Sequence, residues 1–170
     1  MAGKKITDLT DYPGGVFANT NEMEMSVDIG ASVFVSRKVS WTDILSSIPV
    51  NIQVAVSDET TPLVASAPSM TFRSPHAMTL TEVRASLTTA GTGATLVSIT
   101  INVNNVNIFS GGGTGLTIDA TEKTSTTATT PNVIGISAVP DDAEITIDID
   151  SVDSGNVATG LKVTLIGTKI

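Results

Sequence analysis

The sequence predicts an all-β protein, an antiparallel jelly-roll-like β-sandwich with an extended N-terminal arm containing one short helix. From Ile52 onward, short runs rich in β-branched residues alternate apolar with polar positions, and turn residues separate the runs. No segment of helical period and useful length lies between them. Charged residues make up only 15% of the chain, below the ~25% typical of soluble domains. Thr, Ser, Asn and Gly fill the difference, which favours strands over exposed helices.

Two parts are expected along the chain, an arm over residues 1–50 and a sandwich over 51–170. The arm holds the only Trp and the only Tyr, and Gly and Asn residues interrupt its periodicity. Extended stretches are expected at 22–29 and 32–39. Such a segment is too small and too irregular to bury a core of its own, so the core is expected in the sandwich.

One short helix is expected within the arm, over residues 41–48. Ser40 is the expected N-cap, and Asp43 stands where a reciprocal hydrogen-bond partner of the cap is needed. Pro49 should end the helix, because the residue before a proline avoids the helical conformation.

The clearest strand is Val97–Val103, in which every second residue is apolar, so that one face is buried and the other is wetted. Asn104 and Asn105 predict a tight reversal, since Asn tolerates positive φ. The chain should then return antiparallel through 106–109. Further strands are expected at 52–57, 62–67, 70–73, 78–87, 116–120, 122–128, 144–150 and 161–165. About eight strands fit a jelly roll; an immunoglobulin-like sandwich is the alternative, but its Cys and strand Trp signals are absent.

Charge and composition exclude several classes of function. The net charge is −8, from 17 acidic and 9 scattered basic residues, so no nucleic-acid partner is expected. No window approaches the ~20 apolar residues of a membrane span, so no membrane partner is expected. The chain has no cysteine, which removes disulfides, thiol nucleophiles and Cys-ligated metals from consideration. No cofactor is expected.

Two motifs resemble catalytic features only superficially. His76, the single histidine, follows Ser74-Pro75 in a loop, and no nucleophile elbow accompanies it, so a surface or interface role is favoured over catalysis. The run Gly111–Gly115 lacks the lysine of a phosphate-binding loop and leads into a strand rather than a helix. A hairpin connection is the expected structure there.

The acidic residues Asp148, Asp150 and Asp153 form the one candidate metal site. Asp148 and Asp150 alternate with isoleucines, so both carboxylates should point away from the core on one strand face. With Asp153 they could begin a calcium site, since Ca²⁺ takes six to eight oxygen ligands. A solvated strand face or a subunit interface is favoured over this. Paired carboxylates also occur in glycoside hydrolases, but the aromatic content of 4% speaks against a sugar cleft.

The start of the chain resembles a leader found in tailed-bacteriophage virion structural proteins. The likeness is carried by Lys4-Lys5-Ile6-Thr7-Asp8-Leu9-Thr10, by Glu24–Val27, and by Ser36–Leu45 with its closing strand and short helix. In that family the leader is regarded as a virion-attachment adaptor for a distal domain. The resemblance implies attachment to the particle through Lys4, Lys5, Ile6, Leu9, Trp41, Ile44 and Leu45.

The rest of the chain resembles a jelly-roll module of phage head-decoration and fibre proteins. The likeness is carried by Pro75–Leu87, Leu116–Ser125, Asp141–Asp150 and Gly160–Val163. It implies a homotrimer on the virion surface, assembled in the host cytoplasm, and leaves head decoration and fibre open. The short length of the chain favours the head over the tail.

The expected function is that of a non-enzymatic, trimeric capsid decoration or cement protein whose arm docks on the major capsid protein or another virion protein. The alternative is a small tail-fibre or receptor-binding tip, in which loops 110–115 and 153–159 would contact a host glycan. A glycan hydrolase is a distant third.

Overall fold

The structure, a computed structural model, describes residues 22–28 and 34–170. The chain divides into two compact units, Met1–Leu45 and Ser46–Ile170. This division precedes the expected boundary at residue 50, because the first strand of the second unit already begins at Pro49.

The described part of the first unit is a hairpin followed by most of a helix, whose last two residues, Ser46 and Ser47, belong to the second unit. β1 (Glu22–Asp28) pairs antiparallel with β2 (Phe34–Ser40), and α1 (Trp41–Ser47) follows directly. The expected helix is thereby confirmed, and so are the expected extended stretches over residues 22–28 and 34–39. Residues 29, 32 and 33 of those stretches lie outside the described residues. No helix in the described ranges is long and apolar enough to cross a membrane.

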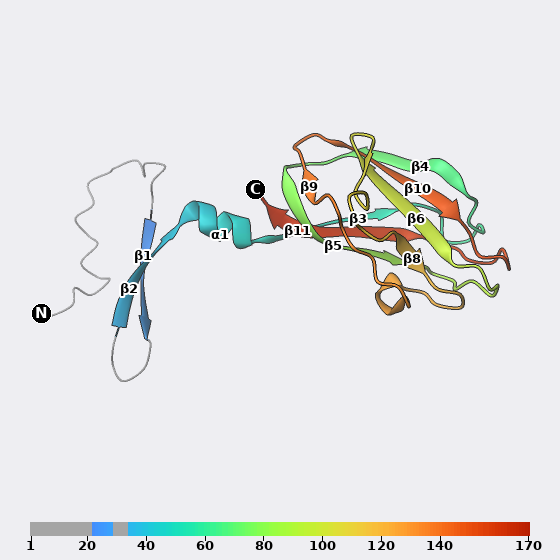
Figure 1. The fold of residues 1–170 in the computed structure, drawn as a ribbon, viewed down its shortest axis with the longest axis horizontal. Helices are drawn as coiled ribbons and strands as arrows, with labels where there is room; N and C mark the ends of the chain where they lie inside the picture. Colours follow the sequence, from blue (N-terminus) through green and yellow to red (C-terminus); the bar gives the residue numbers. More distant parts are fainter. Residues whose placement is uncertain (1–21, 29–33) are drawn as a thin grey trace, which may run out of the picture. The chain divides into compact units, whose positions relative to one another are not determined.

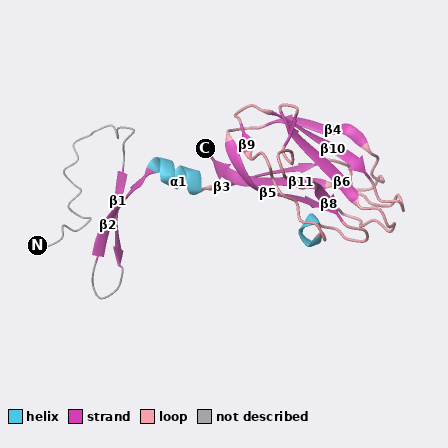
Figure 2. Ribbon diagram, viewed as in Figure 1, coloured by secondary structure: helices cyan, strands magenta, loops and turns pink. Residues whose placement is uncertain are grey.

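The second unit is an all-β sandwich of two antiparallel sheets (Figures 1 and 2). One sheet has the order β3-β11-β5-β9, formed by β3 (Pro49–Ala55), β11 (Lys162–Lys169), β5 (Met78–Ser86) and β9 (Ala138–Val139). The other has the order β4-β10-β6-β7, formed by β4 (Ser66–Arg73), β10 (Glu144–Ser151), β6 (Val97–Val103) and β7 (Val106–Asn107). β8 (Leu116–Ile118) also pairs with β6.

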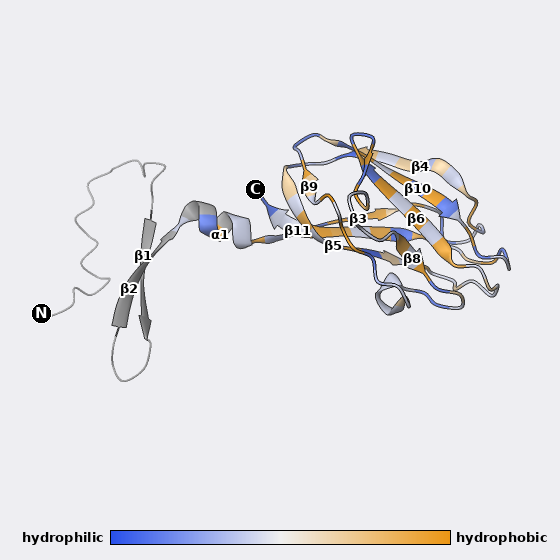
Figure 3. Ribbon diagram, viewed as in Figure 1, coloured by the Kyte–Doolittle hydropathy of each residue, from blue (hydrophilic) through white to orange (hydrophobic). Residues whose placement is uncertain are grey.

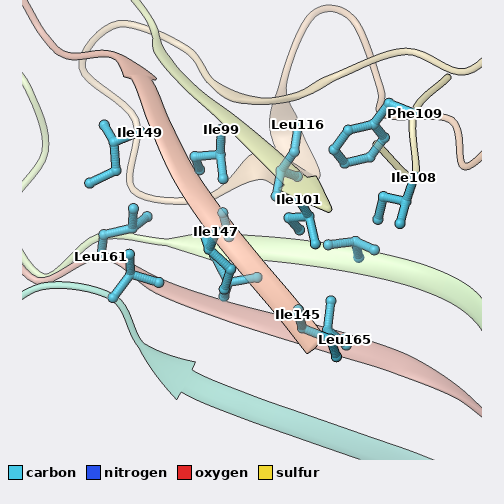
Figure 4. Packing of buried hydrophobic residues seen from close by; sticks show 14 of the residues in the cluster. Ile99, Ile101, Ile108, Phe109, Leu116, Ile145, Ile147, Ile149, Leu161 and Leu165 are labelled. Atoms are coloured by element: carbon cyan, nitrogen blue, oxygen red, sulfur yellow. The ribbon is translucent and has the colours of Figure 1, made fainter. Parts of the chain in front are cut away.

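The core lies between the two sheets, and the alternation in the sequence builds it (Figures 3 and 4). β6 and β10 pair with Ile101 opposite Ile147, and both side chains are fully buried. Leu165 on β11 and Leu161, which directly precedes β11, enter the same cluster from the other side of the sandwich. The predicted one-sided burial of these strands is therefore confirmed.

The predicted reversal after β6 is also confirmed. Asn104 and Asn105 have φ of 49° and 65°, and β7 returns antiparallel to β6. β7 is shorter than expected, because Ile108 and Phe109 leave the strand and turn into the core.

Two expected strands are wrong. Residues 62–67 begin in a loop, and β4 starts only at Ser66, because the Asp58 carboxylate accepts the N–H groups of Thr60 and Thr61 and turns the chain. Residues 122–128 contain the 3-10 turn η2 (Ser125–Thr127), which the Thr124 hydroxyl caps by accepting the N–H of Thr126. In the first case the side chain lies just before the expected strand, and in the second case within it. In both cases it satisfies backbone N–H groups that would otherwise be available for strand pairing.

The close packing of β11 on β5 is predicted to depend on the absence of a side chain at Gly167. The register shifts between Ile166 and Gly167, and a methyl group there would overlap the carbonyl oxygen of Thr79 and lie 2.8 Å from the Met78 Cε. We expect Gly167→Ala to lower the free energy of unfolding by about 1–3 kcal/mol, the usual cost of overpacking.

Urea denaturation measures this difference, with Gly115→Ala as the matched control, because no atom lies within 4 Å of a Cβ at Gly115. An equal loss in both variants would show that overpacking at β11 is not the cause.

Candidate functional site

The first unit holds the expected attachment helix, and its N-terminus is built as a capping box. The Ser40 hydroxyl accepts the Asp43 N–H at 3.0 Å, and the Asp43 carboxylate accepts the Ser40 N–H at 3.2 Å and its hydroxyl at 2.7 Å. The hydroxyl and then the N–H of Ser40 lower the pKa of Asp43. The predicted cap and its partner are thereby confirmed.

The attachment residues predicted from the resemblance fall into two groups. Lys4, Lys5, Ile6 and Leu9 lie outside the described residues. The backbone of Trp41, Ile44 and Leu45 lies in α1, where the Ile44 side chain is half-buried and those of Trp41 and Leu45 lie outside the described part.

The predicted acidic strand face exists on β10. Ile145, Ile147 and Ile149 are buried, and Asp148 and Asp150 project from the opposite face of the strand, as predicted.

Hydrogen bonds from β6 occupy both carboxylates. Asn102 donates to Asp148 at 3.0 Å, and the Thr100 hydroxyl donates to Asp150 at 2.8 Å. These side-chain bonds link β10 to β6 on the outer face of the sheet.

Asp153 is placed differently from the other two predicted ligands. It is only 3% exposed, and its carboxylate accepts the backbone N–H groups of Gly93 at 2.5 Å, Gly155 at 3.1 Å and Val157 at 3.2 Å. Gly91 and Gly93 have no room for a Cβ beside it. The structure does not bring the three aspartates together, and within residues 22–28 and 34–170 no acidic, His or Cys group is arranged to hold a metal.

The electrostatics of Asp153 follow from these contacts. Burial alone would raise its pKa, but the N–H groups of Gly155, Gly93, Val157 and Thr92 favour the ionised form and together lower the pKa. The carboxylate therefore ties the 88–96 loop to the 152–160 loop. The sequence contained a signal for this contact, because three glycines allow the backbone to approach one aspartate closely. The two loops are far apart in the chain, so sequence reasoning did not connect them.

Further contacts join the loops at the same end of the sandwich, which we call the loop end (residues 56–65, 87–96 and 152–161). The Thr88 N–H donates to the Thr159 carbonyl at 2.9 Å, and the Leu63 N–H donates to the Ala158 carbonyl at 2.8 Å. Glu59 pairs with Lys162 at 2.5 Å and accepts the Thr88 hydroxyl. Three separate loops are thus held in one arrangement.

His76 and the glycine run show no built catalytic geometry among the described residues. The buried His76 Nε2 has no hydrogen-bond partner there, and the neighbouring Ser74 hydroxyl donates to the His76 carbonyl. Gly111 and Gly112 have φ of 74° and 101° and lie in the loop between β7 and β8. The expected hairpin connection is wrong, because these two strands each pair with β6 and not with each other.

One open groove of about 350 Å³ lies beside β5. It is lined by Leu80, Thr81, Glu82, Asn132, Val133, Ile134 and Ser137. Its one charged residue, Glu82, accepts two hydrogen bonds from Arg84, at 2.6 and 2.8 Å, which lower the pKa of Glu82. The groove therefore offers an apolar wall and a carboxylate that is already paired.

Comparison with known proteins adds no relative, since no protein-family model, curated protein or solved structure matches the chain. The functional candidates are therefore those that the chain itself presents. They are the hairpin-helix unit and the loop end of the sandwich.

Acid is predicted to loosen the loop end. The N–H groups of Thr61 and Thr60 lower the pKa of Asp58 to about 2. A carboxyl with a lowered folded pKa stabilises the fold above its unfolded pKa, near 3.9, and this contribution is lost as the pH falls from about 4 to about 2. We expect an NMR titration to place the Asp58 pKa near 2, with faster amide exchange of Thr60 and Thr61 below it.

Asp58→Asn serves as the control, because Asn can retain the turn without titrating. Its Thr60 and Thr61 amides should lack the additional acid-induced exchange. An Asp58 pKa near 4 in the native protein would contradict the prediction.

Proposed function

We propose that this protein is a non-enzymatic structural protein of a tailed-bacteriophage virion, a trimeric capsid decoration or cement protein. Its first unit attaches to the major capsid protein or to another virion protein, and its sandwich is displayed on the particle surface. The division of the chain carries the proposal. The sandwich has a core built from residues 56–165, and a separate hairpin and helix precede it.

The first unit gains most from a partner. A single two-stranded hairpin is marginally stable in water, and a helix of seven residues is too short to be stable by itself. A segment of this kind gains order by lying on another protein. Three copies attached together also bind far more tightly than one, because the second and third attachments are intramolecular.

We further propose that the sandwich is a jelly roll. If β7 is set aside and the other sandwich strands are counted in chain order, one sheet has the order first, eighth, third, sixth. The other has the order second, seventh, fourth, fifth. Two interlocked Greek keys produce this interleaving, and it supports the resemblance to head-decoration and fibre modules.

The second candidate is a small tail-fibre or receptor-binding tip. The loop end favours it, because Asp153, Glu59 and Asp58 hold three loops in a defined arrangement. Such a surface could recognise a host glycan without the cost of ordering the loops on binding.

Electron microscopy of the native particle with the protein labelled separates the two candidates. Label distributed over the head supports a decoration protein, and label confined to the tail tip supports a receptor-binding protein. Light scattering of the isolated full-length protein at micromolar concentration tests the trimer, and a monomer would contradict it.

Removal of residues 1–45 is predicted to abolish attachment and to leave the sandwich folded. The cut must precede Ser46, because Pro49 and Val50 already pair with Thr168 and Gly167. We expect the truncated protein to keep its strand circular dichroism and cooperative unfolding, and to be lost from particles in a co-sedimentation assay. Unfolding of the truncated protein would contradict the two-part description.

Trp41→Ala is predicted to weaken attachment while leaving the melting temperature of the sandwich nearly unchanged. Trp41 begins α1, and Ile44 and Leu45 follow it in the sequence at the spacings of three and four that share one face of a helix. Truncating a large aromatic at a packed site costs ~3–5 kcal/mol, which is enough to release an attached copy. Co-sedimentation and thermal unfolding measure the two effects.

Ile170→Ala is the control, since Ile170 is 74% exposed in the second unit. Normal particle attachment of the Trp41 variant with lost binding to cells would instead favour the receptor-binding candidate.

A further inference from the structure

The outer edge of β3 is an unusual feature of the sandwich. β3 is the end strand of its sheet, and among the described residues it pairs only with β11. Its sequence, Pro-Val-Asn-Ile-Gln-Val-Ala, contains no charged residue. Its pairing with β11 runs from Pro49 to Ala55 without a register shift, so the strand carries no bulge.

Other edges of the sandwich carry features that prevent strand pairing. β4 contains Pro68, which lacks an N–H, ends in Arg73, and has a register shift opposite Ile147–Ile149. β9 is only two residues long. Proteins use such features to prevent edge-to-edge pairing, and a long edge without them is a template for another strand.

The backbone of β3 offers hydrogen-bonding groups at this edge. The Val56 N–H donates to the Leu161 carbonyl of the neighbouring chain segment. Because successive residues of a strand direct their N–H and C=O groups to opposite sides, Val50, Ile52 and Val54 bond toward β11. The groups of Asn51, Gln53 and Ala55 therefore point to the free edge.

Pro49 falls in the same alternating set as Asn51, so its missing N–H lies at the free edge, where a proline is tolerated. The side chains divide in the same way. Val50, Ile52 and Val54 are half-buried against the core, whereas Asn51 and Gln53 are exposed on the outer face.

We propose that this edge pairs with the same edge of a second copy of the chain, antiparallel and about a two-fold axis at Ile52. This register places all seven residues of β3 opposite residues of the second copy. Pro49 lies opposite Ala55 and has no N–H, so each end of the contact keeps one backbone hydrogen bond instead of two. Asn51 lies opposite Gln53 of the second copy, and each exchanges backbone N–H···O bonds with the other. Val50 lies opposite Val54, and Ile52 opposite Ile52. The apolar side chains of the two copies therefore meet on one face of the sheet, and the amide side chains meet on the other.

The sequence of β3 selects a second copy as the occupant, because the strand is self-complementary about Ile52. At a net charge of −8, two copies repel each other over most of their surface. On β3 no like charges meet, and the exposed amide side chains of Asn51 and Gln53 meet those of the second copy. The Gln53 side chain donates to Thr164, at 3.2 Å, which leaves its oxygen free to accept.

The contact is two-fold and is independent of the three-fold association proposed above. In a trimer it would join each copy to a copy of a neighbouring trimer. It would also extend the four-stranded sheet of each sandwich into a continuous sheet across the pair.

A single cysteine in this cysteine-free chain tests the two-fold contact. Ile52 would face itself in a non-hydrogen-bonded pair, where Cα atoms lie about 4.5 Å apart, within the range of about 4.4–6.8 Å that a disulfide spans. We expect full-length Ile52→Cys to form a disulfide-linked dimer on air oxidation, seen on a non-reducing gel and lost with reductant.

Three matched variants fix the interpretation. Met70→Cys places a cysteine at a half-buried position of edge strand β4 and should not crosslink. Adding Asn51→Lys and Gln53→Lys to Ile52→Cys sets lysine opposite lysine and should abolish the crosslink. Adding Thr71→Lys instead, at an exposed position of β4, should leave the crosslink intact.

Hydrogen exchange of the unmodified protein gives a readout that needs no substitution. The Asn51, Gln53 and Ala55 amides should exchange more slowly as the protein concentration rises. Equal crosslinking of the Met70 and Ile52 variants, no Ile52 crosslink in a folded protein, or exchange independent of concentration would overturn the proposal.

Discussion

The packing of the β6 and β10 isoleucines against the apolar residues of β5 and β11 is the interaction on which the rest of the structure depends. Ile101, Ile147 and Leu165 have no exposed surface, and full burial of such a side chain contributes about 1.5–3 kcal/mol. Because side chains alternate along a strand, a slip of one residue would turn this whole set toward water. The core therefore fixes the register of the two sheets, and the register fixes where every loop begins.

That register separates the two ends of the sandwich. Pro49 pairs with Thr168, and the Ile170 N–H donates to the Ala77 carbonyl, so the chain enters and leaves at one end. The loops held by Asp58 and Asp153 lie at the end where β3 finishes and β11 begins. The loop end therefore lies at the opposite end of the sandwich from Pro49 and Ile170.

The sequence predicted what alternation and capping determine, and it failed where side chains compete with strand pairing. Val97–Val103 and the Ser40–Asp43 cap are local patterns, and both appear as expected. At 62–67 and 122–128 the composition favoured strands. However, the side-chain oxygens of Asp58 and Thr124 accept hydrogen bonds from nearby backbone N–H groups, and the chain turns there. β9 is held by tertiary pairing to β5 and has no pattern of its own.

The candidate site was harder to predict than the fold, because its contacts join residues distant in the chain. Alternation correctly placed Asp148 and Asp150 on the outer face of β10, but it could not show that Asp153 turns inward to Gly93, sixty residues earlier. The closed arrangement around Asp153 depends on glycines in two loops, and neither loop is periodic.

The sparse charge of the chain and its arrangement favour association over specific faces. A strand face or edge without charges can be covered by another protein without the desolvation penalty that a carboxylate would carry. The outer face of β10 presents Asp148 and Asp150, so two copies meeting there would bring carboxylates together. The uncharged edge of β3 carries no such penalty, and its backbone groups gain partners when it is covered. The distribution of charge therefore favours β3 over β10 for the self-association proposed above.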